Sequence, residues 1–145
     1  MTTQRKAYRA SILHSVADPK DVGLEESYEY FEDGVMVVEN GHIVDLGTAE
    51  DVLARQPKTL DVKEYKDKLI TSGFIDTHIH YPQTGMIASY GEQLLDWLEN
   101  YTFPEEKRFK NPVYAHKVAK LFLDELASNG TTTALVFGTV HKESV

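Results

Sequence analysis

Cysteine is absent from the 145-residue sequence, so neither a disulfide framework nor a thiolate metal site can form. Any bound metal must therefore use histidine and carboxylate ligands. No apolar run approaches the ~20 residues that a membrane-spanning helix needs. The first residues, MTTQRKAYRAS, lack the apolar segment of a signal peptide. Together these absences predict a cytoplasmic protein that does not enter a membrane.

Basic residues are few, with 15 Lys and Arg against 23 Asp and Glu, which gives a formal net charge of −8. A surface of this sign repels polyanions, so we expect neither nucleic acid nor an anionic membrane as a partner. The composition, 41% hydrophobic and 26% charged, is that of a globular chain. Its length is enough for one ordinary domain core but short of the ~250 residues of a complete (β/α)₈ barrel.

Residues 1–69 have the pattern of a β-rich domain. Asn40-Gly41 separates two β-branched runs, which predicts a hairpin because a type I′ turn needs two residues with positive φ. Thr48 and Asp51 resemble a capping box and predict a short helix. Before and after these signals we expect strands at 8–16, 28–31, 35–39, 42–46 and 62–65, with a turn at Glu32-Asp33-Gly34.

Residues 70–145 have a different pattern, which indicates an α/β domain. We expect an apolar strand at 69–76, a helix at 91–100 that ends before Pro104, a helix at 112–129 and a buried strand at 131–137. The 112–129 helix carries one apolar stripe, made of Tyr114, Val118, Leu121, Phe122 and Leu126. A strand, a long helical crossover and a second strand form a βαβ unit, whose strands are parallel.

The segment with the clearest chemistry ends in His78-Ile79-His80. Residues i and i+2 of a strand project to one side, so both imidazoles are expected to point the same way, at the carboxyl end of the strand. Neutral imidazole is a good zinc ligand. A His-x-His pair alone is also common on exposed strands that bind no metal. Asp76 either orients this strand end or a ligand, or simply caps the turn.

The stretch Gly73-Phe74-Ile75-Asp76-Thr77-His78-Ile79-His80 resembles the first-strand signature of the amidohydrolase superfamily. The β-rich start is similar to the small β-sandwich that precedes the (β/α)₈ TIM barrel of those enzymes. Within the superfamily, four further segments resemble the guanine deaminase family. They are His80-Tyr81-Pro82-Gln83, Leu94-Leu95-Asp96-Trp97-Leu98, Tyr101-Thr102-Phe103-Pro104-Glu105 and Asn129-Gly130-Thr131-Thr132-Thr133-Ala134.

The resemblance implies hydrolytic deamination of guanine to xanthine and ammonia by a zinc-activated water. It implies one Zn²⁺ per active site, with His78 and His80 as two of its ligands, and a homodimer. Gln83 matches a glutamine that hydrogen-bonds the purine, and an amide can both donate to and accept from a purine edge. The residues that the resemblance assigns to substrate binding are Gln83, His80, Tyr81, Pro82, Trp97 and Leu98.

The family's remaining zinc ligands and its proton-shuttling glutamate have no counterpart in the 145 residues, so no catalytic residue is assigned in this chain. A catalytic zinc needs about three protein ligands and a water. We therefore expect the chain by itself to be inactive, with an unpaired strand edge and an uncovered apolar face. Two other interpretations remain open: an amidohydrolase acting on a different ring amine or cyclic amide, and a non-catalytic binding or assembly module.

Overall fold

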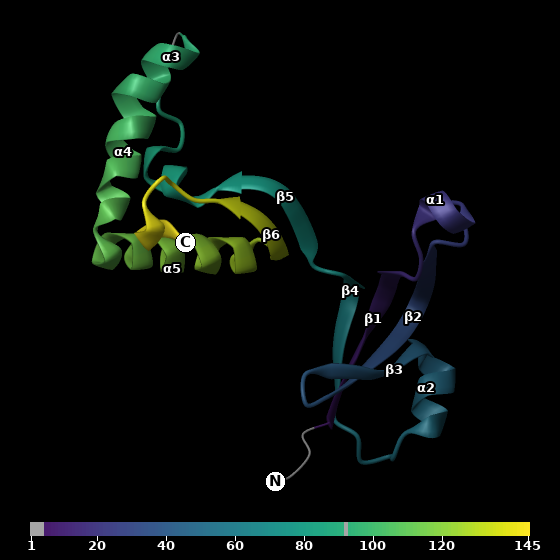
Figure 1. The fold of residues 1–145 in the computed structure, drawn as a ribbon. Helices are drawn as coiled ribbons and strands as arrows, with labels where there is room; N and C mark the ends of the chain where they lie inside the picture. The colour runs from purple at the N-terminus through teal and green to yellow at the C-terminus, as the bar shows by residue number, and fades with distance from the viewer. Residues whose placement is uncertain (1–4, 92) are drawn as a thin grey trace. The chain divides into compact units, whose positions relative to one another are not determined.

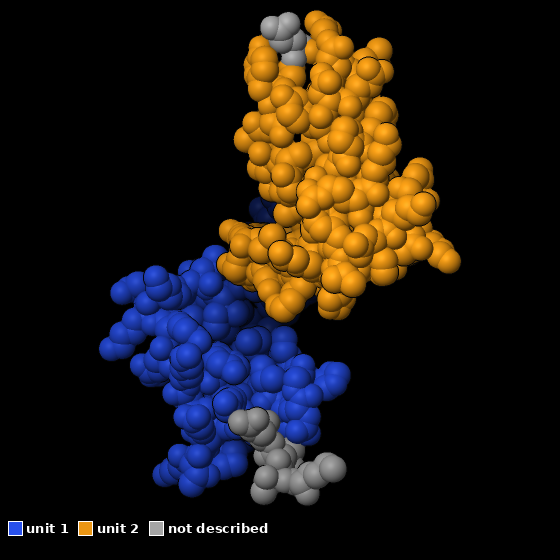
Figure 2. Space-filling model, turned by 90° about the vertical axis from the view of Figure 1, so that its left-hand side faces the viewer, with its two compact units in different colours: residues 1–72 blue, residues 73–145 orange. Residues whose placement is uncertain are grey.

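The computed structural model describes residues 5–91 and 93–145 and divides the chain into two compact units. Unit 1 spans Met1–Ser72 and unit 2 spans Gly73–Val145 (Figure 2). Each unit is described by itself. The division lies close to the boundary expected from the sequence, and the assignment of the two parts as β-sandwich and barrel domains stays a prediction.

Unit 1 is built on one four-stranded sheet with the strand order β3-β2-β1-β4 (Figure 1). β1 pairs with β2 and β2 pairs with β3 in antiparallel fashion, whereas β1 and β4 run parallel. The strands are β1 (Arg5–Ser15), β2 (Tyr28–Glu39), β3 (His42–Thr48) and β4 (Val62–Thr71), and a short helix, α1 (Pro19–Val22), lies between β1 and β2.

The turn expected at residues 32–34 is wrong, because β2 continues through it as a β-bulge. Ala10 pairs with Gly34 and Ile12 with Phe31, so two residues of β2 face one residue of β1 at this point. A Cβ on Gly34 would lie 2.9 Å from the side chain of Ile12. The polar and glycine residues that predict a turn therefore serve a bend inside one strand.

The Asn40-Gly41 hairpin between β2 and β3 is confirmed, with φ of 51° at Asn40 and 82° at Gly41. The helix α2 (Ala49–Arg55) also follows the prediction. Its cap, Thr48, accepts from the backbone N–H of Asp51 at 3.2 Å and donates to the Asp51 carboxylate at 2.7 Å. The small core of unit 1 lies between α2 and the sheet and consists of Ala7, Val35, Val37, Ala49 and Val52.

Unit 2 contains two parallel strands, β5 (Phe74–His80) and β6 (Thr131–Phe137), joined through the long helix α5 (Pro112–Ser128). This confirms the predicted βαβ unit. The single strand expected at 69–76 is wrong: β4 ends at Thr71 and β5 begins at Phe74. Gly73 lies at the break, where the N–H of Phe74 donates to the carbonyl of Gly130 at 2.8 Å.

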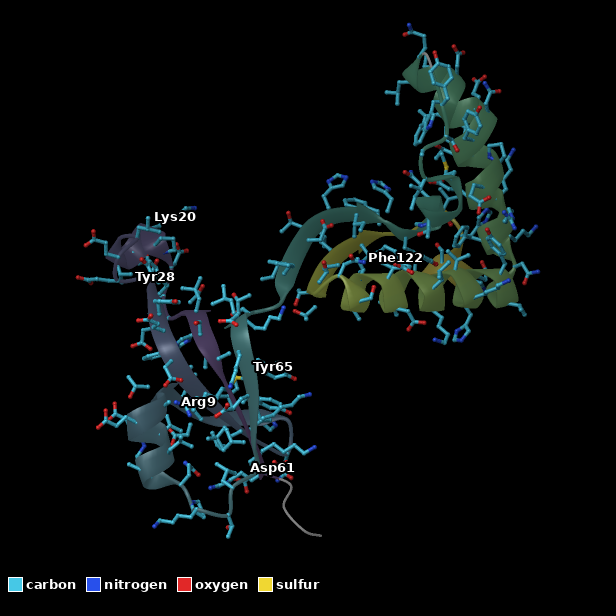
Figure 3. The ribbon with its side chains drawn as sticks, turned by 180° about the vertical axis from the view of Figure 1, so that it is seen from behind. Arg9, Lys20, Tyr28, Asp61, Tyr65 and Phe122 are labelled. Carbon is cyan, nitrogen blue, oxygen red and sulfur yellow. The ribbon has the colours of Figure 1, made fainter. Side chains whose placement is uncertain are left out.

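Helix α5 begins at a capped end, since the Asn111 side chain accepts from the N–H of Val113 at 3.0 Å. Its buried stripe faces the strands and the segment after β5, with Phe122 at its centre (Figure 3). Leu121, expected in this stripe, is 52% exposed. β6 was expected to be buried, yet Leu135 is 62% exposed, because a two-stranded sheet offers little cover beyond the face packed on α5.

Between β5 and α5 the chain forms a helical arm over residues 94–107, made of α3 (Leu94–Trp97), a π-helical turn (Leu98–Thr102) and α4 (Phe103–Lys107). The helix expected to end before Pro104 instead passes through it. In the π turn, the N–H of Phe103 donates to the carbonyl of Leu98, five residues back. Pro104 then falls in the first turn of α4, where no backbone N–H is required.

Three 3₁₀ helices complete unit 2: η1 (Tyr81–Met86), η3 (Arg108–Lys110) and η4 (Lys142–Ser144). Of these, η1 follows directly from the end of β5 and leads toward the arm. Over residues 5–91 and 93–145, no helix combines the length and the apolar character needed to cross a membrane.

Candidate metal and substrate site

The imidazole rings of His78 and His80 converge at the carboxyl end of β5. Their Nε2 atoms lie 3.1 Å apart, and the ring centroids are separated by 5.2 Å. Ile79, between them, packs instead against the apolar core of unit 2. The alternation of a strand therefore places both rings on one side, as the spacing predicts.

The separation of the two nitrogens suits a shared metal ion. Two ligands at ~2.0–2.1 Å from a tetrahedral zinc lie about 3.3 Å apart, close to the 3.1 Å observed. Within the part of the chain that the structure describes, no group of three or more His, Asp or Glu side chains is placed to hold a metal. The pair thus supplies two of the roughly three protein ligands that a catalytic zinc needs, and the same geometry also permits a simple hydrogen bond from one imidazole to the other.

The end of β6 packs against the histidine pair through Phe137. Phe137 pairs with His80 across the two strands, and its ring lies 4.8 Å from the ring of His80 and 4.6 Å from that of His78. Asp76 acts locally, since its carboxylate accepts from the backbone N–H of His78 at 2.9 Å and so fixes the strand end. Both contacts restrict the two imidazoles before any ligand arrives.

A cavity of about 540 Å³ adjoins His80. It brings together three of the residues assigned to substrate binding from the sequence, namely His80, Gln83 and Trp97. They come from β5, η1 and the arm, respectively. Its remaining lining is Ile79, Thr84, Met86, Ile87, Ala88, Phe122, Glu125, Leu126 and Asn129.

Trp97 is held in place by the loop that it faces. Its indole N–H donates to the carbonyl of Ser89 at 3.2 Å, and a Cβ on Gly91 would lie 2.6 Å from the Cβ of Trp97. Ala88, beside it in the cavity lining, has a φ of 63°, a conformation that costs an alanine about 1–2 kcal/mol. With its N–H engaged, Trp97 presents only its apolar ring to a ligand.

The other three residues assigned to substrate binding lie elsewhere in unit 2. Tyr81 and Pro82 are buried, and the Tyr81 hydroxyl donates to the carbonyl of Ser144 at 2.9 Å. Leu98 begins the π turn of the arm, outside the cavity lining. Their assignment stays a prediction.

Helix α5 contributes four lining residues that the sequence did not single out as ligand-binding. Phe122 and Leu126 belong to the apolar stripe, which identifies a core face but not a cavity. Glu125 lies near the end of α5, and Asn129, which caps that end, opens the Asn129–Ala134 segment of the family resemblance. Only the packing of the arm and η1 beside α5 makes them part of this surface.

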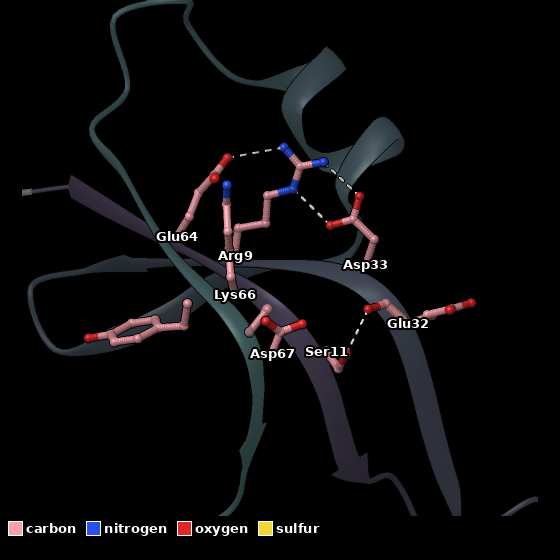
Figure 4. A pocket seen from close by; sticks show the side chains of 9 residues that line it. Arg9, Ser11, Glu32, Asp33, Glu64, Lys66 and Asp67 are labelled. Carbon is pink, nitrogen blue, oxygen red and sulfur yellow. Dashed lines mark hydrogen bonds and ion pairs between the residues drawn. The ribbon is translucent and has the colours of Figure 1, made fainter.

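A second hollow, of about 520 Å³, lies on unit 1 around the bulges of β2 and β4 (Figure 4). Arg9 fills its centre, with two hydrogen bonds of 2.7 Å to Asp33 and one of 3.4 Å to Glu64. Arg9 holds the pKa of the Asp33 carboxyl below its usual range through these hydrogen bonds. Arg9 is engaged by both carboxylates, which indicates a structural ion-pair network rather than a binding site.

The comparisons with known proteins agree with this geometry. The family model described as "Amidohydrolase family" matches residues 69–145. The chain belongs to the amidohydrolase family. The guanine deaminase of Escherichia coli strain K12 is 43% identical over 143 residues, which cover 97% of this chain and 32% of that protein.

Solved amidohydrolase structures show the same relationship. The guanine deaminase of Bradyrhizobium japonicum aligns with a TM-score of 0.85 at 37% identity, over 97% of this chain and 31% of its own. The guanine deaminase of C. acetobutylicum was solved with guanine bound in the active site. It aligns with a TM-score of 0.73 at 28% identity, over 97% of this chain and 32% of its own. The amidohydrolase-type α/β fold and the resemblance to guanine deaminases are thereby confirmed. The chain spans about a third of the length of these relatives.

Proposed function

We propose that this chain forms part of a guanine deaminase, which hydrolyses guanine to xanthine and ammonia. The observation that carries the proposal is the convergence of His78 and His80, of which His80 also lines a cavity with Gln83 and Trp97. The 43% identity to the E. coli guanine deaminase supports the choice of substrate. In the reaction, a water oxygen bonds to the ring carbon that bears the exocyclic amine, the C–N bond breaks, and ammonia leaves.

The proposed metal is Zn²⁺, held in part by the Nε2 atoms of His78 and His80. When bound, the ion supplies Lewis-acid activation of water and stabilises negative charge on the reacting carbon's substituent. The two histidines contribute a pair of neutral donors at a preset spacing of 3.1 Å. Phe137 and Asp76 keep this spacing by packing on the rings and by fixing the strand end.

Gln83 and Trp97 have complementary roles in holding the purine. The Gln83 amide has one accepting oxygen and a donating NH₂ group, so it can satisfy a purine edge that both donates and accepts. Trp97 offers a flat apolar face, which suits the face of the heterocycle. Because its N–H is already bonded to Ser89, the indole adds contact area rather than a second polar contact.

The remaining metal ligands and the proton-transferring group are proposed to come from outside these 145 residues. The span of about a third of the relatives' length supports this. It also agrees with the finding that the described residues supply no third donor near the pair. The homodimer and the β-sandwich and TIM-barrel domains stay predictions from the resemblance, and the cytoplasmic location stays a prediction from the sequence composition.

The decisive experiment uses the full-length enzyme that contains this chain. Purified protein is incubated with guanine, and xanthine and ammonia are measured together with bound metal. We expect equimolar xanthine and ammonia, about one zinc per protomer, and loss of activity on chelation that zinc restores. If a different ring amine or cyclic amide is hydrolysed and guanine gives no xanthine, guanine is not the substrate and the alternative amidohydrolase activity is supported. A protein that binds metal but hydrolyses none of these compounds would indicate a binding module.

A further inference from the structure

The base of the helical arm is fixed by a partly buried carboxylate. Glu105, in α4, has a side chain that is only 12% exposed. It accepts a hydrogen bond from the Tyr114 hydroxyl of α5 and pairs with Arg108 at 2.7 Å. The Arg108 guanidinium also lies over the Tyr114 ring, 4.0 Å from its centroid. The side chains of Glu105, Arg108 and Tyr114 thus hold α4 against the first turn of α5.

The same carboxylate touches the segment that carries Gln83. A Cβ placed on Gly85 would lie 2.8 Å from Oε1 of Glu105 and 3.7 Å from the Tyr114 hydroxyl oxygen. Gly85 belongs to η1, the 3₁₀ helix that contains Gln83. A side chain at this position would push the end of the Glu105 side chain away from its present place. The carboxylate therefore contacts η1, α4 and α5 at once.

The arm connects this point to Trp97 through continuous helical structure. α4 follows the π turn directly, and the π turn follows α3, which ends at Trp97. At its other end, Trp97 is fixed by the carbonyl of Ser89. Because the arm is helical from Leu94 to Lys107, we expect a shift of α4 on α5 to displace Trp97 relative to Gln83.

We propose that Glu105 is a positioning residue, which sets the separation between Gln83 and Trp97 and so fits the cavity to a flat purine. The inference rests on the proposed function and assigns a specificity role to a residue that does not line the cavity. Glu105 acts on binding geometry, whereas the histidine pair serves the chemical step.

The electrostatics favour the interaction of Glu105 with Tyr114 and Arg108 near neutral pH. Burial, and then the neighbouring Glu105 carboxylate, raises the pKa of Tyr114 to about 12, so the phenol stays protonated and remains a donor. The Arg108 guanidinium supplies the opposite charge and keeps Glu105 from being a buried unpaired anion.

The test compares Glu105→Ala, Glu105→Gln and Tyr114→Phe in the full-length enzyme. Asp124→Asn is the matched control, because it removes a carboxylate from the exposed Lys120–Asp124 ion pair on α5. Steady-state kinetics with guanine are recorded with zinc content and thermal midpoint. A ¹⁹F spectrum of 5-fluorotryptophan-labelled protein reports on Trp97, whose signal is assigned by its loss in Trp97→Phe.

For Glu105→Ala we expect KM for guanine to rise about tenfold, the effect of losing one buried charged hydrogen bond, while kcat changes by less than about twofold. The Trp97 resonance should shift and the zinc content should stay the same. Glu105→Gln keeps an acceptor for Tyr114 and should recover part of the loss. Tyr114→Phe should give an intermediate effect, and Asp124→Asn none.

The proposal is overturned if KM and the Trp97 resonance both match the wild type, or if only the thermal midpoint falls. Should Glu105→Ala fail to fold, Tyr114→Phe decides by the same criteria. If the wild-type enzyme does not deaminate guanine, the proposed function fails, and the purine part of this proposal fails with it. A Trp97 shift in that case would still support the coupling of Glu105 to Trp97, so the two failures can be told apart.

Discussion

The Nε2 atoms of His78 and His80 lie 3.1 Å apart on the same side of β5. Their spacing follows from the alternation of the strand and from the Phe137 ring, which packs against both imidazoles. A metal that binds here meets two donors that need little rearrangement, which lowers the entropic cost of coordination. The pair is for this reason the part of the proposed site that is easiest to test.

Replacement of either histidine by alanine should abolish tight zinc binding in the full-length enzyme. Loss of a direct ligand should lower zinc affinity by at least about 100-fold, since even the partners of such ligands are worth ~10–100-fold. Competition with a chromogenic chelator measures the affinity. His116→Ala is the control, because His116 is exposed on α5. Unchanged zinc affinity in both variants would show that the pair is only a hydrogen-bonded surface feature.

Replacement of Gln83 by alanine should weaken guanine binding. An unpaired polar group on the purine costs ~1–3 kcal/mol, so kcat/KM should fall by roughly 10–100-fold with zinc content unchanged. Asp124→Asn is a suitable control, because Asp124 lies in the exposed Lys120–Asp124 ion pair and does not line the cavity. Equal kinetics for wild type and Gln83→Ala would remove Gln83 from the substrate site.

Local sequence patterns predicted the elements whose stabilisation is local. The Asn40-Gly41 hairpin, the Thr48 cap and α5 depend on backbone conformations and side-chain bonds between near neighbours. The convergence of the two histidines follows from strand alternation alone. These features could be predicted from short sequence segments because the interactions that produce them join residues close together in the sequence.

The errors arose where distant contacts decide the structure. Gly34 predicts a turn, but the neighbouring strand holds it in a bulge against Ile12. Pro104 predicts a helix end, but a π turn before it lets the helix continue. The cavity beside Gln83 also depends on α5 packing near η1, which no local pattern records. Such features require knowledge of which elements meet.

Replacement of Gly73 by alanine should destabilise unit 2. The added Cβ would lie 2.1 Å from Oγ1 and 2.7 Å from Cβ of Thr132, so backbone has to move. We expect a loss of ~1–3 kcal/mol in the free energy of unfolding, typical of overpacking. Trp97, the single tryptophan of these 145 residues, reports on unit 2 when this chain is unfolded in urea. In a double-mutant cycle, Thr132→Gly should recover part of the loss, and a cycle without coupling would contradict the steric cause.

Replacement of Asp45 by asparagine should destabilise unit 1 at neutral pH but much less in acid. Hydrogen bonds from Arg55, joined by Gln56, hold the pKa of the Asp45 carboxyl below its usual value of 3.8. A depressed pKa in the folded state stabilises the protein at pH values above 3.8, and this contribution disappears as the pH falls through the folded-state value. The difference between the denaturant midpoints of wild type and Asp45→Asn, measured by circular dichroism, should therefore be larger at pH 7 than at pH 3. In an Arg55→Gln background, the effect of Asp45→Asn on stability should depend much less on pH. The hydrogen bonds from Arg55, which are the main cause of the lowered pKa of Asp45, are then absent. A constant difference at both pH values would mean that Asp45 stabilises β3 by packing rather than by its charge.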